Sequence, residues 1–400
     1  MGALPEGMPW PETNQLRSHR QPDSFHAYVH IPFCEVRCGY CDFNTYTQSE
    51  LGEVKRSQFH LPLIQEMNFA KKVLDESNIA LPRLTSVFFG GGTPSLFQGD
   101  QIAALLEKLR ENFGIDAGAE ITLEANPESS SLELLKELRA AGVNRISFGA
   151  QSFDPEVLRV LDRTHRPELL RPLVDYAKSL GLRTSIDLIY GAPGESLESW
   201  RRTLERAIEL GTEHISAYSL IVEEGTKLAA QIRRGELGET DEDLNAAMHQ
   251  LASELFSSAG LEWYEVSNWG MPSIHNVAYW ESKNWWGFGP GAHSHINGNR
   301  FWNRKHPLAY QQALAKGSPA QGFEEIDTET HLVESVMLRL RTKQGLPREV
   351  LSDLGVSATK VASYLAQGLL TFCSDAIAVT ENGRLLVDGI AVDLVSSVEG

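Results

Sequence analysis

The sequence predicts an α/β protein with two parts: a partial or closed TIM-like barrel of six β/α units, and a smaller C-terminal α+β domain of winged-helix type. Two observations lead to this fold class. Between residues 25 and 259, β-rich apolar runs alternate with segments of helical periodicity, the pattern of a parallel sheet with crossover helices. Beyond residue 260 the alternation stops and the composition changes. The expected barrel strands are residues 26–31, 84–90, 119–125, 145–151, 183–191 and 214–221.

The helices between these strands have recognisable start signals. Ser130 and Glu133 have capping-box spacing at the head of one helix, which a glycine then ends. Ser196 precedes a second helix, and Thr240 and Asp243 are expected to cap a third. In a barrel of this kind, residues that bind or react gather at the carboxyl ends of the strands. We therefore expect the functional site at that edge.

Four segments divide the chain. Residues 1–24 are rich in proline and polar residues, without the apolar core of a signal peptide, and are predicted to be a disordered leader. Residues 25–259 form the barrel, and residues 260–325 a connecting region rich in Trp, Gly and His with little periodicity. Residues 326–400 are predicted to hold two or three helices and a hairpin at residues 381–383, the order of a winged helix.

Composition excludes some functions. The net charge of −17 repels phosphate backbones, so no nucleic-acid partner is expected. No apolar stretch approaches the roughly 20 residues that cross a bilayer, and the protein is predicted to be cytoplasmic. An exposed tryptophan-rich patch in residues 260–325 is compatible with a homodimer, or with peripheral membrane association through partners.

Three of the four cysteines lie within eight residues. Cys34, Cys38 and Cys41 form a C-x3-C-x2-C motif directly after the first expected strand. Three thiolates can hold three corners of an iron–sulfur cubane and leave the fourth iron open to an outside ligand. The spacing therefore favours a cluster that binds a small molecule.

Two other interpretations of the motif stay open. A structural zinc site needs four protein ligands, and His30 is the candidate fourth, although it lies within the expected strand and no second C-x2-C pair exists. The cysteines are also spaced like one buried helix face, against which Pro32 and Gly39 argue because both break helices. The fourth cysteine, Cys373, is expected to be a small buried or half-buried apolar residue.

The motif resembles the hallmark of the radical S-adenosylmethionine (SAM) superfamily, and the similarity continues through nearly all of residues 26–390. It is strongest to the branch that contains oxygen-independent coproporphyrinogen III dehydrogenases and heme chaperones. The resemblance implies a radical SAM barrel with a [4Fe–4S] cluster on Cys34, Cys38 and Cys41, and SAM at the open iron. It also implies reductive cleavage of SAM, which requires a reductase as electron donor and a site shielded from water.

Residues at the expected strand ends match the family's SAM contacts, and each also has an ordinary structural interpretation. Glycines let backbone amides approach a ligand, although such a run also makes turns. Glu124 can accept hydrogen bonds from ribose hydroxyls or an ammonium group, or simply face solvent. Asp187 is flanked by apolar residues and needs a partner if buried, and Arg163 suits a carboxylate or ribose. The resemblance assigns the SAM site to Tyr28, Tyr40, Gly91, Gly92, Thr93, Glu124, Gln151, Arg163 and Asp187.

One position separates the two groups of the branch. The dehydrogenases carry a further cysteine two residues after the third, where this chain has Phe43, and they have a longer region before the cluster than the 33 residues found here. The resemblance is therefore closer to the chaperones, which bind heme and pass it to recipient proteins such as respiratory enzymes. Coproporphyrinogen III dehydrogenase remains the alternative.

Residues 275–280 match the HNxxYW signature that the chaperone group associates with heme binding. Imidazole ligates heme iron, and His275 is the predicted axial ligand. Two alternatives stay open: His275 makes structural hydrogen bonds in the core, or the ligand is His293 or His295.

Overall fold

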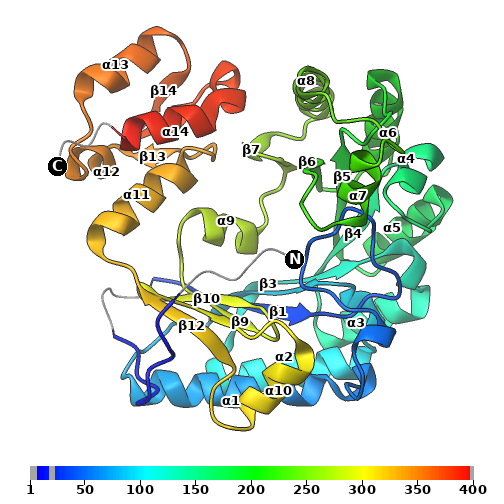
Figure 1. Cartoon of the computed structure of the whole chain (residues 1–400), viewed down its shortest axis with the longest axis vertical. Coiled ribbons are helices and arrows are strands. Elements are labelled where there is room, and N and C mark those ends of the chain that lie inside the picture. The colour runs from blue at the N-terminus through cyan, green and yellow to red at the C-terminus, as the bar shows by residue number, and fades with distance from the viewer. Residues whose placement is uncertain (1–6, 18–22, 397–400) are drawn as a thin grey trace.

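The computed structural model describes residues 7–17 and 23–396 and arranges them around a twelve-stranded sheet (Figure 1). Its centre is the predicted run of six parallel strands, paired in sequence order, which confirms the barrel fold class. Their burial on both faces is typical of a parallel sheet covered by helices. The strands are β1 (Phe25–Ile31), β2 (Leu84–Gly91), β3 (Ile115–Ala125), β4 (Arg145–Gln151), β5 (Arg183–Tyr190) and β6 (His214–Ser219).

Helices follow these strands along the chain and pack against one another outside the sheet, as α1 does on α2 and α2 on α3. Their bounds are α1 (His60–Glu76), α2 (Gly99–Phe113), α3 (Leu132–Ala141), α4 (Pro155–Val160), α5 (Leu170–Ser179), α6 (Leu197–Glu209), α7 (Lys227–Arg233) and α8 (Glu242–Ser258). None of the helices in residues 7–17 and 23–396 is both long and apolar enough to cross a membrane.

Two of the predicted caps are displaced by one residue. Ser131, not Ser130, caps α3, because its hydroxyl accepts from Leu134 N at 3.0 Å. Asp241, not Thr240, caps α8 in the same way. In both cases the neighbouring residue also carries a capping side chain, so composition could not choose between them. The Ser196 cap of α6 is confirmed.

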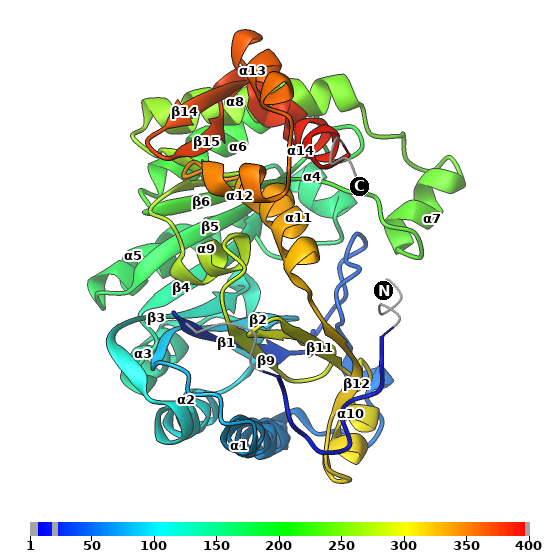
Figure 2. The same cartoon turned by 90° about the vertical axis from the view of Figure 1, so that its left-hand side faces the viewer.

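Residues 260–325 are not a connecting region but part of the sheet. The strands β7 (Trp263–Glu265) and β8 (Asn268–Gly270) extend it beyond β6, while β9 (Trp285–Phe288) pairs in parallel with β1. Three antiparallel strands follow at that edge: β10 (His293–Ile296), β11 (Asn299–Asn303) and β12 (Ala320–Glu325). The helix α9 (Ile274–Trp280) lies on the concave side of the sheet and α10 (Pro307–Leu314) packs on α1 (Figures 1 and 2).

The aromatic residues of this region build the core instead of an exposed patch. Trp269, Trp286 and Trp302 are at most 1% exposed, and Trp263 is also buried. The prediction of an exposed tryptophan-rich patch is therefore wrong, and the homodimer that was predicted from this patch has no support from it.

The C-terminal unit contains a three-stranded antiparallel sheet, ordered β13-β15-β14, and four helices. Its hairpin is β14–β15, which turns at Ser374 and Asp375, and not the predicted one at residues 381–383. Those residues form a 3-10 helix, because Thr380 caps it through Gly383 N. Cys373 is exposed on β14, contrary to expectation. The bounds are α11 (Thr328–Arg339), β13 (Leu346–Pro347), α12 (Arg348–Asp353), α13 (Ala358–Ala366), β14 (Leu370–Cys373), β15 (Ala376–Val379) and α14 (Val387–Val395).

The predicted disordered leader is wrong for residues 7–17, which pack on the barrel. Met8 and Phe323 of β12 exchange two backbone hydrogen bonds of 2.8 and 2.9 Å. The Trp10 ring meets Phe301 edge-on at 5.0 Å, and Leu16 is buried. Residues 1–6 and 18–22, the rest of the predicted leader apart from Asp23 and Ser24, lie outside the described residues.

Candidate cofactor site

The cysteine loop leaves the carboxyl end of β1, at the edge of the sheet where the six parallel strands end. Backbone hydrogen bonds fix its path: Cys34 N donates to Tyr46 O at 3.0 Å, and Cys41 N donates to Cys38 O at 3.2 Å. All three thiols are free and half-buried. The loop therefore lies at the edge where the sequence placed the functional site.

Two of the thiols contact hydrogen-bond donors. Thr93 Oγ1 lies 3.6 Å from Cys34 Sγ, and Arg163 Nη1 lies 3.5 Å from Cys38 Sγ. Burial raises the pKa of the Cys41 thiol to about 11 and also raises the pKa of Cys34. The free thiols of Cys34 and Cys41 are therefore protonated near neutral pH, whereas a bound metal centre holds its cysteine ligands as thiolates. Donors placed at thiolate sulfurs stabilise them and tune the centre.

The surroundings fit a cluster with three cysteine ligands. A Cβ at Gly92 would come within 2.5 Å of Phe33 O and 3.1 Å of Cys34 Sγ, so only glycine lets the chain pass this close to the loop. His30, the alternative fourth zinc ligand, already has both ring nitrogens hydrogen-bonded at 2.9 Å. In the described part of the chain, no three His, Cys, Asp or Glu side chains converge on a position for one metal ion, whereas in a cubane each thiolate binds a separate iron. The half-buried thiols, their two donors and the glycine together fit a cubane with one open iron.

Glu124 lies at the end of β3, where the glycine run passes it. Its Oε2 accepts from Gly91 N at 3.2 Å. Gly91 has a φ of +113°, and a Cβ there would strike the His30 ring at 2.5 Å, so this position requires glycine. Burial, with the nearby Asp187 carboxylate, raises the pKa of Glu124 to about 8. This carboxyl group has spare acceptor capacity that a ligand with N–H or O–H donors would use.

Asp187 and Gln151 continue the site across β5 and β4. Asp187 is half-buried and accepts from Ser147 Oγ and Ser216 Oγ at 2.8 Å each, the partners that the sequence required for it. Burial raises its pKa. Gln151 has a left-handed φ of +60° at a bulge in β4, a conformation that costs energy in a non-glycine residue. Such strain is common where a side chain is aimed at a ligand.

Asn126 is a site residue that the sequence analysis did not single out. Its Nδ2 donates to Thr93 Oγ1 at 3.2 Å, and its Oδ1 accepts from Arg163 Nη2 at 3.0 Å. Because Thr93 contacts Cys34 and Arg163 contacts Cys38, Asn126 links the donors of two thiols. Its position directly after the Glu124 strand end was the available signal.

The two predicted tyrosines have different neighbours. The Tyr28 hydroxyl forms a hydrogen bond of 2.9 Å with His30 Nδ1, and its ring stacks on that of Phe88 with 6.3 Å between the ring centroids. Tyr40 packs against a small apolar cluster that α4 and α7 contribute to, and Leu228 N in α7 donates to Gly39 O at 2.8 Å. Tyr28 therefore faces the barrel interior, whereas Tyr40 anchors the loop to the helices beyond β4 and β6.

The structure places His275 inside the barrel, 2% exposed. Its Nδ1 pairs with Ser86 Oγ at 2.7 Å, its Nε2 pairs with Tyr279 OH at 2.9 Å, and its ring stacks on Phe88 at 5.2 Å. Burial and nearby His26 hold its pKa well below the ordinary value. Both ring nitrogens are engaged, so the prediction of His275 as an axial ligand does not fit this arrangement; the alternative of structural hydrogen bonds does.

The two alternative heme ligands, His295 and His293, differ in how accessible they are. His295 is buried, and its Nδ1 pairs with Lys283 O at 2.9 Å. His293 is exposed at the start of β10, and its ring stacks on Trp302 at 5.8 Å. Of the three, His293 has the most accessible imidazole.

A parallel barrel with three cysteines on the loop after its first strand defines a radical SAM protein, and the model of the Radical SAM superfamily matches residues 28–207. The heme chaperone HemW of Mycobacterium tuberculosis is 43% identical over 93% of this chain and 95% of its own length. HemW of Bacillus subtilis is 33% identical over 90% and 96%. The solved structure of coproporphyrinogen III oxidase (HemN) from Escherichia coli, a radical SAM enzyme, matches with a TM-score of 0.80 and 25% identity over 94% and 91%.

The chain belongs to the HemW family. As a member of the radical SAM superfamily, it has a [4Fe–4S] cluster and SAM as its cofactors.

Proposed function

We propose that this protein is a heme chaperone, which binds heme and transfers it to recipient proteins such as respiratory enzymes. The observation that carries the proposal is the similarity to the M. tuberculosis chaperone along nearly the whole of both chains. Phe43 supports it, because this exposed residue stands where the resemblance places a further cysteine in the dehydrogenases. We place the protein in the cytoplasm, with any membrane contact made through its recipients.

We assign the cluster to Cys34, Cys38 and Cys41. SAM, bound at the open iron, supplies reductive carbon–sulfur cleavage when an electron arrives from a reductase. The contacts described above support a SAM site formed by Tyr28, Tyr40, Gly91, Gly92, Thr93, Glu124, Gln151, Arg163 and Asp187.

The roles of the chain's own residues follow from their contacts. Arg163 holds Cys38 and brings positive charge to a thiolate sulfur. The Gly91–Glu124 contact places a backbone amide and a carboxyl group side by side, which suits an amino acid head group with both charges. The half-buried Asp187 keeps its oxygens ordered through two serine hydroxyls.

For the heme we propose His293 as the first axial candidate. This exposed residue stacks its ring on Trp302, and partial burial of the ring, followed by the positive charges of Arg300 and Lys305, lowers its pKa. Heme propionates are anionic, and cations next to an accessible imidazole suit them. His275 remains the competing assignment, and would require both of its hydrogen bonds to break.

The test is an anaerobic hemin titration of the cluster-reconstituted protein, following the Soret band in wild type, His293→Ala and His275→Ala. We expect saturation near about one heme per chain in wild type and loss in His293→Ala only. Loss in His275→Ala alone, with circular dichroism and cluster content unchanged, would return the assignment to His275. No saturable binding by the wild type would refute the chaperone function.

Coproporphyrinogen III dehydrogenase is the second candidate, because the HemN structure matches over 94% of this chain. Anaerobic incubation with coproporphyrinogen III, SAM and a reductant distinguishes the two. We expect no decarboxylated porphyrin; sustained turnover would favour the enzyme.

A further inference from the structure

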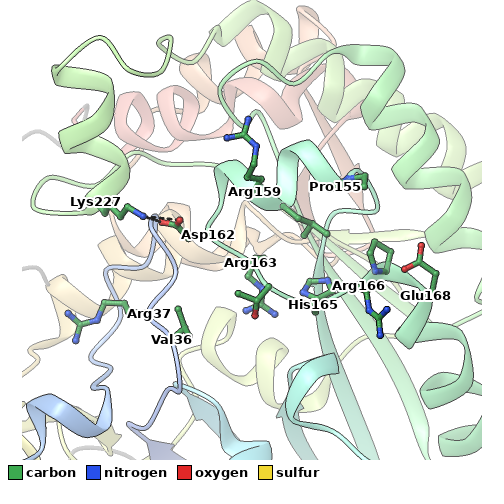
Figure 3. Close-up of a pocket in the computed structure, with 13 residues that line it drawn as sticks. Val36, Arg37, Pro155, Arg159, Asp162, Arg163, His165, Arg166, Glu168 and Lys227 are labelled. Atoms are coloured by element: carbon green, nitrogen blue, oxygen red, sulfur yellow. Dashed lines mark hydrogen bonds and ion pairs between the residues drawn. The ribbon is translucent and has the colours of Figure 1, made fainter.

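One cation in the barrel interior differs from the cations at the surface. Five cations line the surface cavity beside the cysteine loop, and four of them have a carboxylate within 3.7 Å, as Figure 3 shows for Lys227 and Asp162. Arg145, the first residue of β4, is only 3% exposed, yet it makes no ion pair with any described residue. Burying a guanidinium without an ion pair is costly, so its other contacts need an explanation.

The Arg145 guanidinium lies on the inner face of the barrel, among side chains of β3, β5 and β6. Nη1 donates to Thr122 Oγ1 of β3 at 3.4 Å, and Nη2 donates to Ser185 Oγ of β5 at 2.9 Å. Nη2 also donates to His214 Nδ1 of β6 at 3.1 Å. The strand register places these residues on one face of the sheet, together with Asp187, which follows Ser185 by two positions.

A chain of two serines connects Arg145 to Asp187. Because an arginine can only donate, Ser185 accepts from it, and its own proton goes to Ser147 Oγ, 2.6 Å away. Ser147 in turn donates to Asp187 Oδ2 at 2.8 Å, so every donor points from the guanidinium towards the carboxylate. Ser216 donates to the other oxygen, Oδ1, at 2.8 Å. The arrangement therefore matches an ionised Asp187, which accepts on both oxygens.

A second chain holds the guanidinium in place from the other side. His214 Nδ1 accepts from Arg145, so the ring proton lies on Nε2, which donates to Asn268 Oδ1 at 2.7 Å. Burial, followed by Arg145, lowers the pKa of His214 to about 3, which agrees with this neutral tautomer. The Asn268 amide then donates to the buried Glu265. Arg145 is therefore fixed between two hydrogen-bonded chains, each of which ends at a carboxyl group.

The charge of Arg145 also acts on the carboxyl groups of the candidate cofactor site. Burial raises the pKa of Asp187, and the two serine hydroxyls and Arg145 oppose that rise. Arg145 likewise opposes the rise in the pKa of Glu124 that burial and Asp187 cause. Charges interact more strongly in a protein interior than at the surface, so Arg145 favours ionised carboxylates without touching them.

We propose that Arg145 is a positioning residue of the SAM site, which acts through Ser185 and Ser147 to hold the Asp187 carboxylate ionised and in a fixed orientation. The inference rests on the proposed SAM site. Each Asp187 oxygen accepts one serine hydroxyl and retains acceptor capacity for a hydroxyl or amine of the ligand. The carboxylate is half-buried, so a ligand at the strand ends can reach it.

The test measures the SAM affinity of the cluster-reconstituted protein by anaerobic isothermal calorimetry. Ser185→Ala removes one oxygen from the chain, and Ser185 itself makes its hydrogen bonds to Arg145 and Ser147, not to Asp187. Thr184→Val is the matched control, because the buried Thr184 hydroxyl has no partner among the described residues and lies on the opposite face of β5. Near neutral pH we expect Ser185→Ala to weaken binding by about fivefold, Arg145→Met by about tenfold or more, and Thr184→Val to leave it unchanged.

The pH profile of SAM binding distinguishes a positioning role from a structural one. Without its link to Arg145, Asp187 keeps its proton to a higher pH, so the affinity lost in Ser185→Ala should be regained as the pH rises above neutrality. The other groups that face Asp187 are the same in wild type and Ser185→Ala, so the ratio of the two affinities isolates Asp187. Those titratable and charged groups are Glu124 of β3, Arg145 of β4, and His214 and Tyr218 of β6.

Equal SAM affinity in wild type and Ser185→Ala would overturn the inference, even if Arg145→Met fails to fold. A loss of affinity that is the same at every pH would also overturn it, since a purely structural defect does not titrate with Asp187. Both outcomes leave the proposed heme chaperone function intact, because the hemin titration measures that function separately. A wild-type protein with an intact cluster that binds no SAM would overturn the proposed cofactor site, and this inference with it.

Discussion

The two ends of the barrel interior handle buried polar groups in different ways. Near the amino ends of the strands, such groups satisfy one another: Glu120 accepts from Ser273 Oγ at 2.8 Å and pairs with Arg183 at 3.3 Å, and His275 is held on both sides. At the carboxyl ends, Glu124 accepts one backbone hydrogen bond and has its pKa raised to about 8. The first region is complete without a ligand, and the second is not. A polar group inside the barrel therefore indicates a binding site only where the protein's own hydrogen bonds leave part of its donor or acceptor capacity free.

The largest effect is expected at the cysteine loop. Single substitutions Cys34→Ala, Cys38→Ala and Cys41→Ala should each abolish the [4Fe–4S] cluster, because a cubane with two protein ligands has no stable anchor. Iron and sulfide content after anaerobic reconstitution measures this. Cys373→Ala is the control and should keep full iron, since that thiol is exposed on β14, remote in the chain from the loop. Full iron in any of the three variants would refute the assignment.

Matched substitutions of the two β3 glutamates test the comparison directly. Glu120→Gln should lower the free energy of unfolding by about 2 kcal/mol, since it weakens the buried ion pair with Arg183. Glu124→Gln should not lower that free energy, and should weaken SAM binding by about tenfold or more. Denaturant titration and isothermal calorimetry measure the two quantities. Destabilisation by Glu124→Gln with unchanged SAM affinity would reverse the roles given to the two ends.

The pH dependence of stability sharpens the same contrast. Because the folded pKa of Glu124 rises from 4.5 to about 8, the folded state binds its proton more tightly than the unfolded state does. This contribution is full below pH 4.5 and is lost as the pH rises towards about 8, so stability falls across that window. Burial also raises the pKa values of Glu66, Glu195 and Glu265, to about 7 each, so these groups also make stability fall with rising pH. The prediction therefore concerns the difference in unfolding free energy between wild type and Glu124→Gln at each pH. Parallel stability curves for the two proteins would contradict it.

The smallest effect concerns Asn126, which orders the donors of two thiols. Asn126→Ala should leave iron content intact, lower the free energy of unfolding by about 1 kcal/mol, and shift the reduction potential of the cluster downwards, because the sulfur contacts of Thr93 and Arg163 loosen. Potentiometric titration measures the shift. Asn112→Ala is the control, because this half-buried residue of α2 donates its amide to Asn68 of α1 and makes no contact with the cysteine loop. An unchanged potential would make Asn126 a structural residue only.

The barrel was predictable because its six strands, each at least six residues long, alternate with segments of helical periodicity. The strands β7–β12 were not, since several have three or four residues and their tryptophans are buried by contacts far apart in the sequence. In the site as well, features that depend on local sequence were predictable, and features that depend on contacts between distant residues were not. Cys34, Cys38 and Cys41 are recognisable from spacing alone, whereas the role of Asn126 depends on Thr93 and Arg163 meeting in space. His275 shows what a sequence motif cannot decide. The same motif is compatible with a heme ligand and with a core residue, and only the hydrogen-bond partners of the ring distinguish the two.

The pairing of Met8 with Phe323 has a practical consequence for handling this protein. It covers part of β12, the last strand of the sheet, whose outer edge would otherwise present free N–H and C=O groups. Exposed edges of this kind recruit strands from other molecules. A shortened chain that begins at β1 would keep the barrel and the cysteine loop, yet we expect it to aggregate on storage. Expression designs should therefore retain the segment from Gly7 to Arg17.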